Sequence, residues 1–85
     1  MASIDEVIAA ISANAEAVNE VQGQVEGSKA MAEETLGQLQ ALNVEGAAAA
    51  VGVCKDQLEE CSALAAALHN KLNEAMSAAA AAKQS

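Results

Sequence analysis

The chain has 85 residues, of which 53% are hydrophobic, with no aromatic residue, no proline and a net charge of −8 at pH 7. This length allows one small domain, and the excess of 12 acidic over 4 basic side chains argues against nucleic acids, anionic membranes and phosphate ligands as partners. No aromatic ring is available to stack on a base.

Large core residues are scarce, because the sequence has 23 Ala but only 17 Val, Ile and Leu together. Fully burying one such side chain is worth roughly 1.5–3 kcal/mol, whereas ordering one residue costs about 1.5 kcal/mol. A lone helical hairpin of this composition is therefore marginal. We expect a homo-oligomer, most simply a dimer forming a four-helix bundle, or a complex with a related hairpin protein.

The first expected element is an amphipathic helix over about residues 3–42. Ser3 and Glu6 form a capping box, in which the Ser hydroxyl accepts from an amide of the first turn. One heptad core position is expected at Ile4, Ile11, Val18, Val25, Ala32 and Leu39. The second core position is expected three residues later, at Val7, Asn14, Val21, Ser28, Thr35 and Leu42.

A turn is expected over about residues 42–46, within Asn43, Val44, Glu45 and Gly46. Asn43 and Gly46 both tolerate left-handed backbone, and Asn43 can also cap the helix that follows. The turn divides the chain into two halves of nearly equal length.

The second expected helix covers about residues 46–82. Its core positions are Val51, Leu58, Ala65, Leu72 and Ala79, and, three residues later in each heptad, Cys54, Cys61, Leu68, Ala75 and Ala82. The sequence therefore predicts an all-α fold in which residues 1–85 form a single antiparallel two-helix hairpin, similar to a coiled coil.

The two thiols allow two interpretations. Cys54 and Cys61 lie ~10.5 Å apart along one helix, too far to bridge each other. Inside the hairpin they would be reduced core residues against Ala32 and Val25. Alternatively, two second helices pack antiparallel about an axis near Leu58, so that Cys54 of one chain faces Cys61 of the other.

Catalytic groups are poorly supplied, since His69 is the only histidine and no nucleophile–base pair can be assembled. We expect His69 at the flank of the core and no catalytic residue, cofactor, metal site or small-molecule substrate. The uncharged stretch from Gly46 to Cys54 is too short to span a bilayer, and the chain starts with Asp5 and Glu6 instead of a basic region. We expect a cytoplasmic protein, or one exported without a Sec-type signal.

The segment Val44-Glu45-Gly46-Ala47-Ala48-Ala49, between two helices of about 40 residues, resembles the turn of the WxG family of small hairpins. Val44 stands where that family has its Trp, and the family's C-terminal Tyr signal has no counterpart here. The resemblance implies a non-enzymatic protein–protein interaction module, an adaptor or effector of type VII secretion. The composition and start are also similar to uncharacterised Ala-rich actinobacterial hairpins. The alternative interpretation is a structural protein that self-assembles into a bundle or filament.

Overall fold

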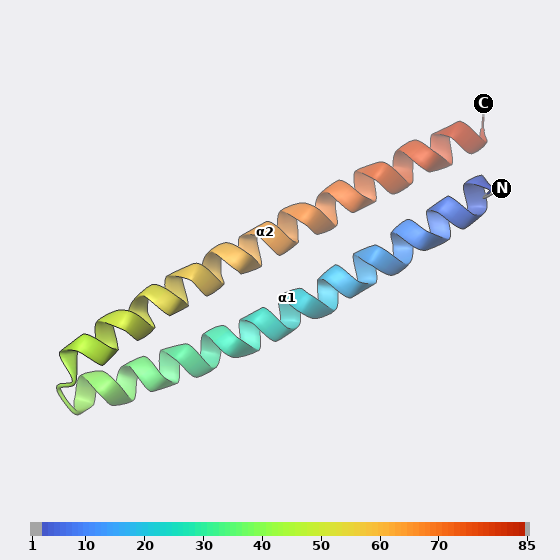
Figure 1. Ribbon diagram of the computed structural model, residues 1–85. Helices are drawn as coiled ribbons and strands as arrows, with labels where there is room; N and C mark the ends of the chain where they lie inside the picture. Colours follow the sequence, from blue (N-terminus) through green and yellow to red (C-terminus); the bar gives the residue numbers. More distant parts are fainter. Residues whose placement is uncertain (1–2, 85) are drawn as a thin grey trace.

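The computed structural model describes residues 3–84 and consists of two long antiparallel helices joined by a short turn (Figure 1). Helix α1 runs over Ile4–Ala41 and helix α2 over Glu45–Lys83. The described chain measures 63 × 16 × 14 Å and contains no strand. The predicted all-α hairpin is therefore confirmed.

The start of α1 uses the expected cap. The Ser3 hydroxyl oxygen accepts a hydrogen bond from the Glu6 amide at 3.2 Å, and the Ser3 carbonyl accepts from the Val7 amide at 3.1 Å. Because the Glu6 amide has no carbonyl partner within the helix, the Ser3 side chain stabilises the first turn.

Helix α1 ends in a Schellman motif centred on Asn43. Asn43 adopts a left-handed backbone with φ 58°. Its amide donates to the Gln40 carbonyl at 3.1 Å, and the Val44 amide donates to the Leu39 carbonyl at 3.0 Å. This pair of bonds satisfies the last carbonyls of α1 and reverses the chain.

Two details of the turn differ from the expectation. Gly46 lies inside the first turn of α2, and no described glycine has a positive φ. The residue that precedes α2 is Val44, which makes no side-chain capping bond. Asn43 therefore supplies the left-handed residue alone and ends α1 without capping α2.

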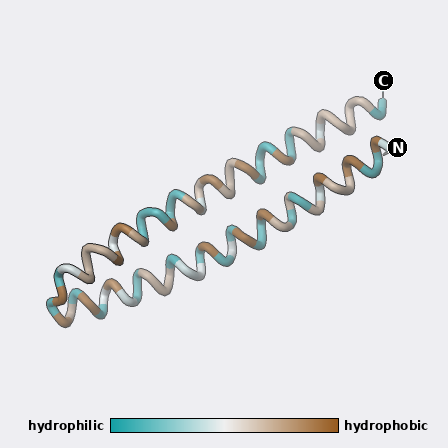
Figure 2. Tube along the Cα trace, in the orientation of Figure 1, coloured by the Kyte–Doolittle hydropathy of each residue, from teal (hydrophilic) through white to brown (hydrophobic). Residues whose placement is uncertain are grey.

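The contact between the helices is a single seam along their whole length. We define the seam as the positions that alternate at three- and four-residue spacing and are buried or half-buried: Ile8, Ile11, Ala15, Val18, Gln22, Val25, Lys29, Ala32, Leu36 and Leu39 on α1, and Ala48, Val51, Lys55, Leu58, Ser62, Ala65, His69, Leu72, Met76 and Ala79 on α2. Among the residues that the structure describes, only Ala15, at 5% exposed, and Ser62, at 9%, are buried. Figure 2 agrees, since apolar residues recur along both helices without gathering in one core.

One predicted core position lies in this seam and the other does not. The seam contains Ile11, Val18, Val25, Ala32, Leu39, Val51, Leu58, Ala65, Leu72 and Ala79, while Ile4, beyond its end, is 39% exposed. The second predicted core position was wrong on both helices. The other seam position of each heptad lies three residues before the first, as Ile8 lies before Ile11, and not three residues after it. Exposed instead of in the seam are Val7, Asn14, Val21, Ser28, Thr35, Leu42, Cys54, Cys61, Leu68, Ala75 and Ala82.

Candidate interaction surface

The hairpin has two unlike sides, which flank the seam. In this antiparallel pair, the residue directly after the first seam position of each heptad, such as Ser12 after Ile11, lies on one side of the seam. The residues directly before each seam position, such as Val7 before Ile8 and Ala10 before Ile11, lie on the other side. On one side these flanking positions are rich in acids, including Glu26 and Glu33 on α1 and Glu59 on α2. We call this the acidic side.

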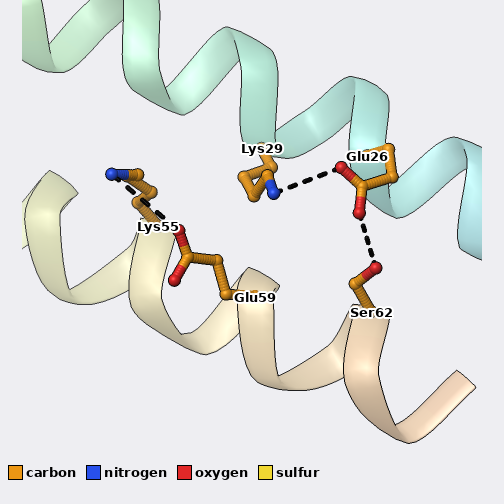
Figure 3. Close-up of polar contacts among 5 residues, drawn as sticks. All are labelled: Glu26, Lys29, Lys55, Glu59 and Ser62. Carbon is orange, nitrogen blue, oxygen red and sulfur yellow. Dashed lines mark hydrogen bonds and ion pairs between the residues drawn. The ribbon is translucent and has the colours of Figure 1, made fainter. Parts of the chain in front are cut away.

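Charged groups connect the two helices on the acidic side (Figure 3). The Ser62 hydroxyl of α2 donates to Glu26 Oε1 of α1 at 2.6 Å, and Lys29 Nζ lies 3.2 Å from the other oxygen of Glu26. Near the open end, Lys83 Nζ lies 2.6 Å from Asp5 Oδ1. Asp5 is three heptads before Glu26, and Lys83 is three heptads after Ser62, so both contacts belong to one register.

These contacts shift two titratable groups. The hydrogen bond from Ser62, followed by the bond and charge of Lys29, holds the pKa of Glu26 below its usual value. The pKa of Lys29 is raised, chiefly by its hydrogen bond with Glu26 and by that group's charge. Both shifts favour the charged forms, so Glu26 and Lys29 form an ion pair beside the seam, next to the Ser62 hydroxyl.

The two sides of the seam differ in burial. Three small residues on the acidic side, Ser12, Gly52 and Ala66, are half-buried although they lie outside the seam. Every flanking residue on the opposite side is exposed. The hairpin is thus partly closed on the acidic side, over these three residues, and open along the other.

The open side carries no acidic residue, and we call it the acid-free face. It consists of Val7, Ala10, Asn14, Ala17, Val21, Gln24, Ser28, Met31, Thr35, Gln38 and Leu42 on α1, and Ala47, Ala50, Cys54, Gln57, Cys61, Leu64, Leu68, Lys71, Ala75, Ala78 and Ala82 on α2. Lys71 is its one charge. Its large apolar side chains include Met31, Leu64 and Leu68, which are 66%, 69% and 51% exposed. All 12 acids of the chain lie elsewhere, on the acidic side or on the outer edges.

Both thiols lie on the acid-free face. Cys54 and Cys61 are free and exposed. The interpretation that buried them inside the hairpin against Ala32 and Val25 is therefore wrong, because the seam beside them is occupied by Lys55 and Ser62. Thiols in this position are accessible to a second molecule that packs on the face.

His69 lies in the seam itself and not at its flank, which corrects the expectation. It is half-buried, and its Nδ1 lies 3.5 Å from Asn73 Nδ2, one helical turn away. Ser62 was not anticipated as an interhelical hydrogen-bond donor. The signal for both was the seam spacing, since residues 55, 62 and 69 share one heptad position with Met76.

The described residues offer little to a small ligand. A shallow hollow at the turn, lined by Gln40, Asn43, Val44, Glu45 and Ala48, measures about 210 Å³. Pockets for small molecules typically measure roughly 300–1,000 Å³. Within residues 3–84 no group of three or more His, Cys, Asp or Glu side chains is placed to hold a metal ion. Neither helix, over the residues described, is long and apolar enough to cross a membrane.

Comparisons of the chain with protein-family models, with curated proteins and with solved structures found no match. The surfaces of the hairpin are therefore the basis for its functional assignment.

Proposed function

We propose that this protein is a non-enzymatic protein–protein interaction module, whose hairpin completes its core against the helices of a partner. The observation that carries the proposal is the mismatch between its interior and its surface. Within residues 3–84 no side chain is fully buried, whereas Met31, Leu64 and Leu68 each leave more than half of their surface in water.

The composition of the seam supports the same proposal. One seam position of each heptad is apolar, but the other holds Gln22, Lys29, Lys55, Ser62 and His69 in the middle of the hairpin. Half-buried apolar side chains gain only part of the roughly 1.5–3 kcal/mol that full burial provides. Partner helices that cover the exposed apolar residues would supply the missing burial.

We favour a homo-oligomer, and a dimer forming a four-helix bundle is its simplest form. An adaptor role of the WxG kind is a narrower version of the proposal. It is supported by the layout of two nearly equal helices, Ile4–Ala41 and Glu45–Lys83, joined at mid-chain. Its test is export of the chain from a host with and without an active type VII secretion ATPase.

The general proposal is tested by the mass and the unfolding transition of the purified protein. We expect a dimeric mass by sedimentation equilibrium and a thermal midpoint that rises over a 100-fold increase in concentration, because association stabilises the folded state by mass action. A monomer that unfolds cooperatively at high temperature, independently of concentration, would contradict the proposal, since the hairpin would then be complete alone. A mass far above that of a tetramer would favour the self-assembling filament instead.

A further inference from the structure

We infer that the acid-free face is the surface through which two copies of this chain pack, face to face, about a two-fold axis. This inference rests on the proposed interaction function and names its partner, a second copy, and its surface.

The charge distribution selects this face. Two copies each carry a net charge of −8, so any contact that brings their acids together is repulsive. Packing through the acidic side would place Glu26, Glu33 and Glu59 of one copy near the same residues of the other. The lysines of that side are already engaged, since Lys29, Lys55 and Lys83 each pair with an acid of their own chain.

The packing of the hairpin points to the same face. Helices of bundles commonly present three apolar positions per heptad, the two of the seam and one flanking position. On the acid-free face the flanking positions include Val7, Val21, Leu42, Leu68 and both cysteines, all of them exposed. The helices have closed on the opposite side, over Ser12, Gly52 and Ala66. A second layer of helices on the open side would therefore bury the third apolar position without moving the first two.

The size of the face suits a stable dimer. The described chain extends 63 × 16 × 14 Å, so one of its long sides spans at most roughly 1,000 Å², compared with about 800 Å² per partner in a standard interface. A two-fold axis packs the face of one copy against the same face of the second copy. The one charged side chain that each copy brings to this contact is Lys71. A basic partner would find no acid there to pair with, which is why a second copy fits this face better.

The test compares a new acid on the face with the same change outside it. Leu64→Glu and Leu68→Glu introduce a carboxylate at positions that are exposed in the hairpin, so neither disturbs the seam. Val53→Glu is the matched control, because Val53 is 56% exposed on the outer edge of the same helix. We expect the two face variants to raise the dimer Kd about 100-fold or more, since each places a carboxylate inside a contact with no group built to receive it, and the control to change it less than threefold. Circular dichroism verifies that all variants remain helical.

The native thiols provide a second readout. We expect Cys54 and Cys61 of the unmodified protein to react slowly with a maleimide at concentrations where the dimer forms, and rapidly on dilution or in Leu68→Glu. A dimer that survives both face variants, or that Val53→Glu dissociates, would overturn the inference and leave the interaction function standing. A monomer of low stability would also overturn it, because the partner would not be a second copy. A monomer that is stable alone would overturn both.

Discussion

The outer edges of α1 carry three glycines that a stabilising substitution can test. Gly23, Gly27 and Gly37 lie in the helix, away from the acid-free face, and a Cβ built on each meets no heavy atom within 4 Å. Glycine inside a helix costs about 0.5–1 kcal/mol relative to alanine, because it loses more backbone freedom on folding. We therefore expect the triple change to Ala to raise the free energy of unfolding by about 1.5–3 kcal/mol.

The assay is thermal unfolding by circular dichroism at one fixed concentration, where a domain of this size gains roughly 4–8 °C per kcal/mol. Ala30→Gly is the reciprocal control, because Ala30 is exposed at the same heptad position as Gly23 and Gly37. It should lower the free energy of unfolding by about 0.5–1 kcal/mol, and the thermal midpoint by roughly 2–8 °C. If the triple variant instead loses stability or dissociates, a partner helix packs against the glycines, and the reasoning that places the partner on the acid-free face is refuted.

Three further predictions concern the turn, the acidic side and the thiols. Asn43→Ala should lower the free energy of unfolding in urea by about 1 kcal/mol and Asn43→Gly should not, because left-handed backbone disfavours alanine but is accessible to glycine and, through local hydrogen bonds of its side chain, to asparagine; equal stabilities of the two variants would contradict this. Ser62→Ala should raise the pKa of Glu26 toward its ordinary 4.5, followed by carboxyl NMR. In the unmodified protein, the stability that Glu26 gains from Ser62 is present above the ordinary pKa of the carboxyl and is lost as the pH falls through the lowered pKa of Glu26. An unchanged titration of Glu26 in Ser62→Ala would refute the contact. Mild oxidation should trap a covalent dimer through Cys54 of one copy and Cys61 of the other, and either single change to Ser should abolish it. A folded protein that forms no covalent dimer would exclude an antiparallel pair of α2 helices with the axis near Leu58. It would leave the acid-free face open as the dimer surface in another alignment.

The two helices and the turn were predictable because local signals agree. The chain has no proline, Ser3 caps the first helix, and Asn43 is a residue that tolerates the left-handed conformation found there. Gly46 offered a second left-handed candidate. One left-handed residue suffices for a Schellman motif, so Gly46 was free to join α2.

The second stripe of the seam was mispredicted for a physical reason. In several heptads hydrophobicity favours the wrong residue: Val21 over Gln22, Cys61 over Ser62 and Leu68 over His69. The pairs Ile8 with Ile11 and Leu36 with Leu39 marked the correct spacing at the two ends of α1. Hydrophobicity was misleading because the hairpin places apolar residues on its open face.

Polar contacts and apolar burial have separate roles in this hairpin. Exposed ion pairs such as Asp5 with Lys83 contribute little free energy. Together with the bond between Ser62 and Glu26, they form in the observed alignment of α1 on α2, and a shift of one helix along the other would separate each pair. Polar groups thus favour this register inside one chain, while much of the apolar surface stays exposed. A partner is therefore expected to stabilise the hairpin without changing its fold. This behaviour is expected of an interaction module whose second layer of helices comes from another copy of the same chain.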